Sequence, residues 1–149
     1  MADILDMRAK KTLIERIKLR LSLSKKEVFL RADFKDLGGY DQVGRALKTL
    51  IDQGLMVRLG QGLFARARKN RITGTPTIAV AGGFKRAVEI ALDRLGVVWT
   101  YNKATEDYNR GLSNQIPANL VYRVKTHFTR KLYLGKLKAE FEYSSTLYA

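Results

Sequence analysis

The clearest pattern of hydrophobic and polar positions in the chain covers residues 42–53. Apolar side chains recur there at the i, i+3, i+4, i+7 and i+8 spacing of an amphipathic helix, which buries one stripe and exposes the opposite face. The stripe consists of Val43, Ala46, Leu47, Leu50 and Ile51. Residues 31–37 show a shorter helical pattern, and residues 4–21 show a longer one. The sequence therefore predicts three helices before residue 54.

Glycines mark the ends of these predicted helices. Gly38 and Gly39 separate the second helix from the third, and we expect them to adopt the positive φ angles of a tight turn. Asp41 is placed to cap the third helix with its side-chain oxygen. Gly54 is placed to end that helix, as a glycine commonly does.

Short apolar runs around these helices predict strands. Residues 28–30 are β-branched and aromatic, and residues 55–59 and 63–66 alternate on either side of the turn Gly60-Gln61-Gly62. The order is strand, short helix, glycine turn, helix and then a basic hairpin. This order predicts a winged helix-turn-helix in residues 1–71.

The second half of the chain predicts a small α+β domain over residues 84–149. Residues 84–95 and 104–110 have helical spacing and end at glycines. The expected strands cover residues 97–101, 120–125, 128–134 and 137–143. Gly135-Lys136 suits the type II′ turn of a hairpin between the last two. Because Pro76 excludes a continuous helix, residues 72–83 are expected to be a loop-like linker, and the fold class is α+β.

The charge of the chain is its least ordinary property. It has 28 Lys and Arg residues against 14 Asp and Glu residues, a net charge of +14, and a pI near 10.2. Residues 1–71 hold 17 basic and 8 acidic side chains, and residues 72–149 hold 11 and 6. Such an excess is typical of proteins that bind polyanions.

The exposed face of the helix over residues 42–53 and the hairpin that follows it predict a site for double-stranded DNA. Side chains able to reach base edges and nearby phosphates are Gln42, Arg45, Lys48 and Thr49. Side chains able to contact the phosphate backbone from the hairpin are Arg58, Arg66, Arg68, Lys69 and Arg71. The alternatives are that these are solvated surface residues, or that the winged helix docks a protein.

The residues that enzymes and metal sites need are scarce. There is no cysteine, and the only histidine, His127, has no acidic neighbour to orient it. Glu140 and Glu142 share one side of a predicted strand, where a solvent-facing role explains them more simply than a metal. We therefore expect no enzymatic activity, no cofactor and no metal.

The chain has no apolar stretch long enough to cross a bilayer, and residues 1–6 do not read as a signal peptide. We expect a cytoplasmic protein that does not contact membranes. Because operators commonly mirror protein symmetry, a homodimer is plausible. The aromatic residues available for its interface are Phe141, Tyr143 and Tyr148.

A polar segment from Asn109 to Asn119 leaves a second reading open. Its amides, together with Tyr108, could stack on and hydrogen-bond an unpaired base, as in proteins that read single-stranded RNA. They could equally satisfy the backbone of their own loop. An RNA-binding module is therefore the main alternative to DNA binding.

Four segments of the chain resemble a known bacterial family. They are residues 28–68, Thr73-Gly74-Thr75-Pro76, the phrase from Tyr108 to Pro117, and Thr129-Arg130-Lys131-Leu132. They resemble the AbiEi-like antitoxins of type IV toxin–antitoxin systems, which are small and often plasmid-borne. The resemblance implies a winged helix that binds operator DNA and represses its own promoter. It also implies a nucleotidyltransferase-like toxin as partner, without a stable complex between the two.

Overall fold

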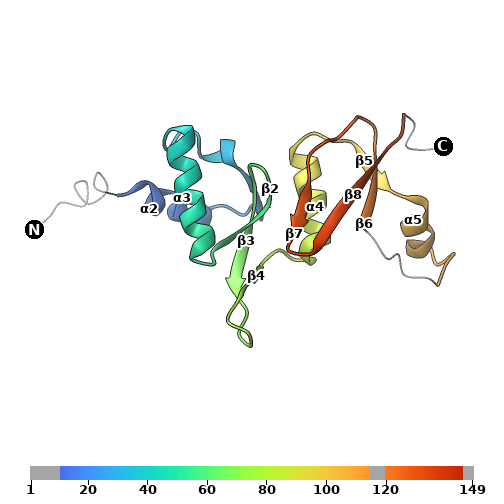
Figure 1. Cartoon of the computed structure of the whole chain (residues 1–149), viewed down its shortest axis with the longest axis horizontal. Coiled ribbons are helices and arrows are strands. Elements are labelled where there is room, and N and C mark those ends of the chain that lie inside the picture. Colours follow the sequence, from blue (N-terminus) through green and yellow to red (C-terminus); the bar gives the residue numbers. More distant parts are fainter. Residues whose placement is uncertain (1–10, 115–119, 146–149) are drawn as a thin grey trace, which may run out of the picture. The chain divides into compact units, whose positions relative to one another are not determined.

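The computed structural model describes residues 11–114 and 120–145, which fall into two compact units (Figure 1). The first unit is Met1–Val57 with Gly62–Ala79, and the second is Arg58–Gln61 with Val80–Ala149. Helices and two four-stranded sheets make the fold α+β, which confirms the predicted class. Residues 4–10 of the first predicted helix, residues 115–119 of the polar segment and Tyr148 lie outside the described residues.

The N-terminal part of the chain is built on a sheet in which β3 is central. Its elements are α2 (Leu13–Leu23), β1 (Val28–Leu30), the 3₁₀ helix η1 (Arg31–Phe34), α3 (Tyr40–Asp52), β2 (Met56–Gly60), β3 (Leu63–Lys69) and β4 (Pro76–Ile78). The strand order is β1-β3-β2, and β4 also pairs with β3. Phe29 pairs with Phe64 where β1 meets β3, and both phenylalanines are buried.

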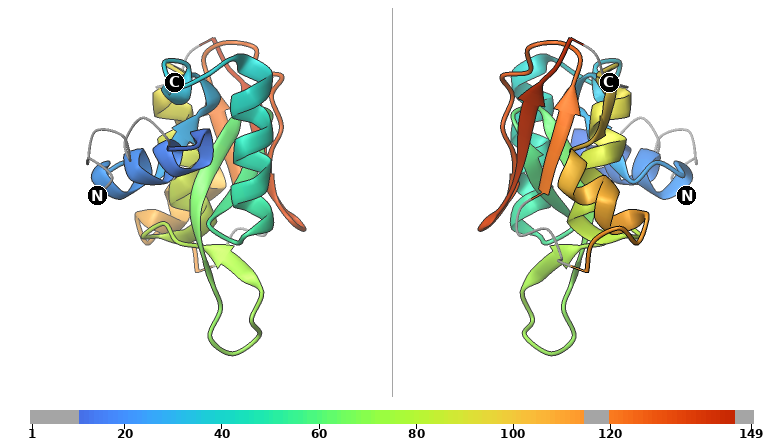
Figure 2. Two further views of the ribbon diagram at one scale, coloured as in Figure 1. Left: turned by 90° about the vertical axis from the view of Figure 1, so that its left-hand side faces the viewer. Right: turned by 90° about the vertical axis from the view of Figure 1, so that its right-hand side faces the viewer.

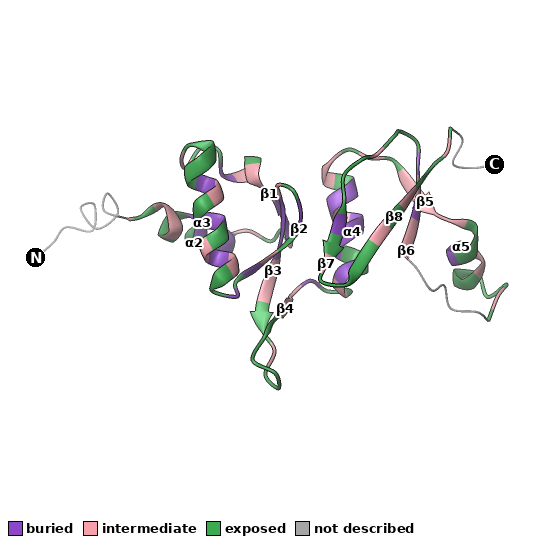
Figure 3. Ribbon diagram, viewed as in Figure 1, coloured by how far each residue is buried: buried purple, intermediate pink, exposed green. Residues whose placement is uncertain are grey.

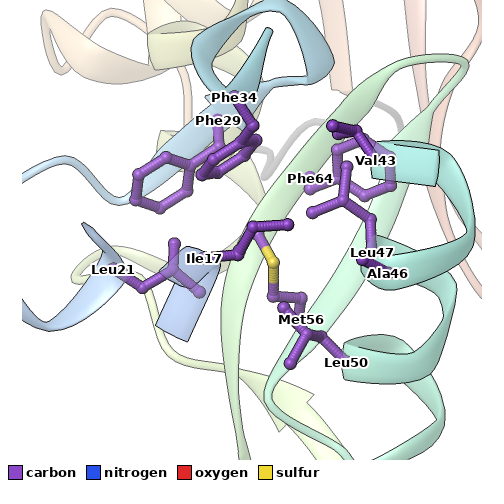
Figure 4. Packing of buried hydrophobic residues seen from close by; sticks show 10 residues of the cluster. All are labelled: Ile17, Leu21, Phe29, Phe34, Val43, Ala46, Leu47, Leu50, Met56 and Phe64. Carbon is purple, nitrogen blue, oxygen red and sulfur yellow. The ribbon is translucent and has the colours of Figure 1, made fainter. Parts of the chain in front are cut away.

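The hydrophobic core of this unit follows the predicted helical stripe. Val43, Ala46, Leu47 and Leu50 of α3 are all buried, whereas Ile51 at the edge of the stripe is half-buried. They pack with residues of α2, β1, η1, β2 and β3, as Figure 4 shows: Ile17, Leu21, Phe29, Phe34, Met56 and Phe64. The opposite face of α3 is exposed (Figure 3). The amphipathic helix is therefore confirmed.

The turn before α3 differs from the prediction. Gly39 is the N-cap residue with a φ of −67°, and neither Gly38 nor Gly39 has a positive φ. The cap is made by Gln42, whose Oε1 accepts a hydrogen bond from Gly39 N at 3.3 Å, while Asp41 lies inside the helix. A Cβ at Gly38 would lie 3.3 Å from Leu13 Cδ2, so the glycine allows the chain to pass close to the Leu13 side chain of α2. Gly54 does end the helix, with a φ of +77°.

A hairpin that the sequence did not predict follows β3. Residues 76–78, expected to be part of a linker, form β4, whose Ile78 pairs with Ala67 of β3. Proline is tolerated on an edge strand, so Pro76 stops a helix without stopping this pairing. In the connecting turn, Asn70 Oδ1 accepts hydrogen bonds from the backbone N–H groups of Ile72 and Thr73 at 2.8 and 3.1 Å. We call residues 67–78 the arm, which projects from the rest of its unit (Figure 2).

The second unit packs a helix against one face of a mixed sheet. Its elements are α4 (Gly83–Arg94), β5 (Trp99–Tyr101), α5 (Lys103–Asn109), β6 (Leu120–Val124), β7 (Leu132–Leu134) and β8 (Leu137–Tyr143). The strand order is β5-β6-β8-β7, with β6 and β8 parallel. Gly135 has a φ of +60° in the β7–β8 turn, as a type II′ turn requires. Residues 128–131, predicted to be strand, lie outside β7, and the Phe128 ring packs edge-on against Phe141.

Candidate nucleic-acid interface

The exposed face of α3 carries balanced charges. Arg45 and Lys48 lie at its centre, but Asp41 and Asp52 are on the same face, and all four are exposed. Carboxylates repel a phosphate backbone, so α3 by itself offers no strong attraction to DNA. The net positive charge of this unit must therefore come from residues around the helix.

Two of the four predicted residues on α3 already bond to the helix backbone. Gln42 uses its amide oxygen to cap the helix, which leaves its N–H groups for a ligand. Thr49 Oγ1 donates to the carbonyl oxygen of Arg45 at 3.1 Å and is half-buried. Both residues, together with Arg45 and Arg16 of α2, line a groove of about 470 Å³ between the two helices. Arg45 and Lys48 are the exposed basic residues at the centre of the exposed face of α3.

Arg31 is a candidate that the sequence analysis missed. Its guanidinium lies over the ring of Tyr40, 4.1 Å from the ring centroid, beside the first turn of α3. A Cβ at Gly44 would be 3.0 Å from Arg31 Nη2, so the glycine leaves room for this flat cation. Gly44, a glycine in the middle of an amphipathic helix, was the sequence signal that another side chain packs closely at this position. Tyr40 is 69% exposed, so the pair lies at the surface.

Arg66 has a structural role that the sequence analysis did not predict. Its Nη2 donates to Leu21 O and Ser24 O, and its Nε donates to Lys26 O, each at 2.7 Å. These oxygens belong to the C-terminal end of α2 and the segment after it, where carbonyl groups lack helical partners. The guanidinium also lies over the Phe29 ring. Arg66 therefore ties β3 to α2, and its contact with the DNA backbone stays a prediction.

Strands β2 and β3 pair as the predicted hairpin. Gly62 has the positive φ expected of a hairpin, at +70°. The tip residues Arg58–Gln61 are grouped with the second unit, in which Arg130 Nη1 donates to Gln61 O at 3.0 Å. Arg58 is exposed on β2, apart from the arm. Of the five predicted basic residues, Arg58 lies on β2, Arg66, Arg68 and Lys69 lie on β3, and Arg71 lies in the turn after β3.

The arm carries the remaining three predicted residues. Arg68, Lys69 and Arg71 are all exposed. A hollow of about 460 Å³ on the arm is lined by Arg68, Lys69, Asn70, Arg71, Ile72 and Thr77. The sequence from residue 53 to residue 88 contains no Asp or Glu, so nothing along the arm opposes its charge.

The arm begins next to the end of α3. A Cβ at Gly54, just after the helix, would lie 3.5 Å from Pro76 Cγ and 3.8 Å from Lys69 Cγ at the base of the arm. Ile72 lies at the tip of the arm, and its side chain is 94% exposed. Its backbone N–H donates a hydrogen bond to Asn70 Oδ1. The basic arm thus presents the exposed apolar side chain of Ile72 at its tip.

Other residues considered for chemistry belong to the second unit. The His127 ring stacks on Tyr143, with 4.0 Å between ring centroids, and Glu140 and Glu142 are exposed on β8. Across residues 11–114 and 120–145, no group of three or more His, Asp or Glu side chains could hold a metal ion. No helix in the described part of the chain is both long and apolar enough to cross a membrane.

Comparison with known proteins places the chain in a family. No curated protein and no solved structure matches it. A family model described as a family of unknown function, DUF6088, matches residues 13–147, which cover both units. The chain therefore belongs to the DUF6088 family.

Proposed function

We propose that the chain binds double-stranded DNA through its first unit and acts as a sequence-specific transcriptional regulator. The element order α2, β1, η1, α3, β2, β3 and the strand order β1-β3-β2 support a winged helix-turn-helix in this unit. In that arrangement, the second helix of the pair lies in the major groove. Here that helix is α3.

In this proposal, specificity and affinity come from different residues. Arg45 and Lys48 read base edges from the exposed face of α3, where Asp41 and Asp52 weaken attraction to arbitrary DNA. Attraction to the phosphate backbone comes from Arg16, Arg31 and the arm, which flank the helix.

The arm contacts the DNA beside α3. Its acid-free basic surface follows the phosphate backbone, and Ile72 at its tip enters the minor groove. Apolar side chains that enter this groove wedge between base steps and bend the duplex. The observation that carries the proposal is the position of this arm, which starts against the end of the amphipathic helix.

The proposal is tested by titrating the full chain with two DNA duplexes of about 40 base pairs, enough for two half-sites. One duplex comes from the region upstream of its own gene, and the other has the same composition in shuffled order. Fluorescence anisotropy at two salt concentrations should show at least about 10³-fold tighter binding to the first. Equal binding of both duplexes would exclude a specific regulator. Preference for a structured RNA at the higher salt would favour the RNA-binding alternative instead.

The resemblance to AbiEi-like antitoxins extends this proposal to regulation of the chain's own promoter. We expect expression of the chain to lower the activity of a reporter placed behind its upstream region, and the variant Arg45→Ala to restore that activity. An antitoxin role would involve a nucleotidyltransferase-like toxin without a stable complex. Rescue of growth in cells that express such a neighbouring gene tests that role separately, because repression does not require it.

A further inference from the structure

A cavity of about 590 Å³ lies within the second unit. Its volume is in the range of pockets that hold small molecules in proteins. Its walls come from α4, α5, β6 and the β7–β8 hairpin, and consist of Phe84, Lys85, Thr105, Tyr108, Asn109, Leu120, Lys136, Leu137, Lys138 and Glu140. The DNA-binding proposal uses none of these residues.

The charged residues of the cavity favour an anion. Among the lining residues, three lysines (Lys85, Lys136 and Lys138) outnumber one carboxylate, Glu140. Lys85 is also paired with Glu89, which does not line the cavity. Lys136 and Lys138 are exposed and lie in or beside the β7–β8 turn, whereas Lys85 belongs to the first turns of α4. Ammonium groups that come from separate elements to one cavity suit a phosphate or carboxylate.

A buried carboxylate holds Lys85 at the cavity wall. Lys85 Nζ lies 2.9 Å from Glu89 Oε2 and donates to the Tyr101 hydroxyl at 2.8 Å. Glu89 is 4% exposed and also accepts a hydrogen bond from the Tyr122 hydroxyl at 2.8 Å. Burial by itself lowers the pKa of Lys85, but the bonds to Tyr101 and Glu89 raise it overall, so the amine stays charged. Of the three N–H donors of this ammonium, one remains for a ligand.

The rest of the cavity suits a planar ring. Phe84, Leu120 and Leu137 supply apolar surface, and Tyr108 on α5 is 40% exposed beside them. The side chain of Asn109 has both a donor and an acceptor, as the edge of a nucleobase requires. An aromatic ring stacks on any base, whatever its sequence.

We propose that this cavity binds a nucleotide, either free or as an unpaired residue of RNA. The lysines hold its phosphate, its base stacks on Tyr108, and Asn109 hydrogen-bonds the base edge. A nucleotide carries a phosphate and a ring in one molecule, which matches a cavity that offers cations and apolar surface together. The second unit would then sense a nucleotide while the first contacts DNA.

The test is isothermal titration of the full chain with three kinds of probe: ribonucleoside 5′-monophosphates, inorganic phosphate and a short single-stranded oligoribonucleotide. We expect a monophosphate or the oligonucleotide to bind about tenfold or more tightly than inorganic phosphate, because the ring adds contacts. Binding of a monophosphate supports a free nucleotide, and binding of the oligonucleotide alone supports RNA. Equal affinity for inorganic phosphate, or no binding of any probe, overturns the proposal.

Variants locate the binding in this cavity. Tyr108→Ala should weaken binding about tenfold, whereas Tyr108→Phe should keep it, since stacking needs only the ring. Lys136→Ala should also lower the nucleotide affinity about tenfold, because it removes one charge-assisted hydrogen bond. The matched control is Lys103→Ala, which lies on α5 outside the cavity lining. Unchanged affinity for the nucleotide in folded Tyr108→Ala and Lys136→Ala proteins would refute the site. Arg45→Ala should leave the nucleotide affinity unchanged, whether or not the chain binds DNA.

Discussion

Arg66 Nη2 lies 2.7 Å from the carbonyl oxygen of Leu21, near the C-terminal end of α2. The backbone of the same residue joins two strands to β3, because Arg66 N donates to Glu27 O and Arg66 O accepts from Ala79 N. One arginine thus connects β1, the end of β4 and α2 to the central strand. Its contribution is to the fold of the first unit.

Replacing Arg66 with alanine should lower the free energy of unfolding by about 2–3 kcal/mol, because three carbonyl groups lose a charged donor. Urea denaturation measures this change. The matched control is Arg68→Ala, two residues along the same strand and exposed, which should change stability by less than about 0.5 kcal/mol. An Arg66→Ala protein as stable as wild type, but with weaker DNA binding, would contradict this structural role and support the predicted phosphate contact.

The contacts of Arg66 are an example of structure that the sequence did not predict. Its acceptors lie 40 to 45 residues away, and no local pattern reveals a side-chain contact over that separation. The stripe of α3 and the glycine at position 54 were predicted, because helical periodicity and a positive φ are local properties. The pairing of β4 with β3 and the parallel pairing of β6 with β8 were not, since strand partners depend on the whole chain.

Only part of the candidate site was predicted, because only its local features could be inferred from the sequence. Surface exposure of Arg45 and Lys48 follows from the buried stripe, so the sequence placed them on the outer face of α3. It could not place the basic residues after α3, because their positions depend on which hairpin projects. Arg31 was missed because its place beside Gly44 arises from packing between η1 and α3.

Replacing Arg45 with alanine should reduce the preference for the chain's own upstream duplex over the shuffled duplex. A bidentate contact to guanine contributes about 1–3 kcal/mol of discrimination, so the ratio of the two affinities should fall accordingly. Anisotropy titrations of both duplexes give that ratio. Arg110→Ala in the second unit is the control, because Arg110 is an exposed arginine paired with Glu106 on α5. If the ratio is unchanged in Arg45→Ala, α3 does not read bases.

Neutralising the arm should act on all DNA sequences alike. Arg71→Ala and Lys69→Ala should each lower the slope of log affinity against log salt by about one unit, because each removes one phosphate contact. Lys103→Ala, in the second unit, should leave the slope unchanged. Slopes come from titrations of the shuffled duplex over a series of salt concentrations. If the slope of log affinity against log salt is unchanged in both arm variants, the phosphate contacts are made by residues outside the arm.

Replacing Ile72 with alanine should reduce DNA bending without changing the salt dependence of binding. The side chain is 94% exposed and uncharged, so the expected loss concerns insertion between base steps and not phosphate contact. Energy transfer between dyes at the two ends of the duplex measures the bend. Ile72→Leu keeps an apolar wedge and should keep the bend. Wild-type bending in Ile72→Ala would show that the arm does not enter the stack.

The stability of the second unit should fall in alkaline solution because of Tyr122. Burial, followed by the hydrogen bond to Glu89, raises the pKa of Tyr122 above its ordinary value of 10.0. In the unfolded chain the phenol loses its proton near that value, whereas the folded protein keeps it. The stabilisation is therefore fully present below about pH 10 and is lost progressively as the pH rises above it.

Tyr122→Phe removes this titration. At neutral pH the variant should be less stable by about 1–2 kcal/mol, since Glu89 loses a buried donor. Above about pH 10 its unfolding free energy should fall less steeply than that of wild type. Urea denaturation between neutral pH and about pH 11 measures both effects. Tyr133→Phe, at a tyrosine that is 40% exposed, should keep the wild-type slope. If Tyr122→Phe also keeps that slope, a group other than the Tyr122 phenol controls alkaline unfolding.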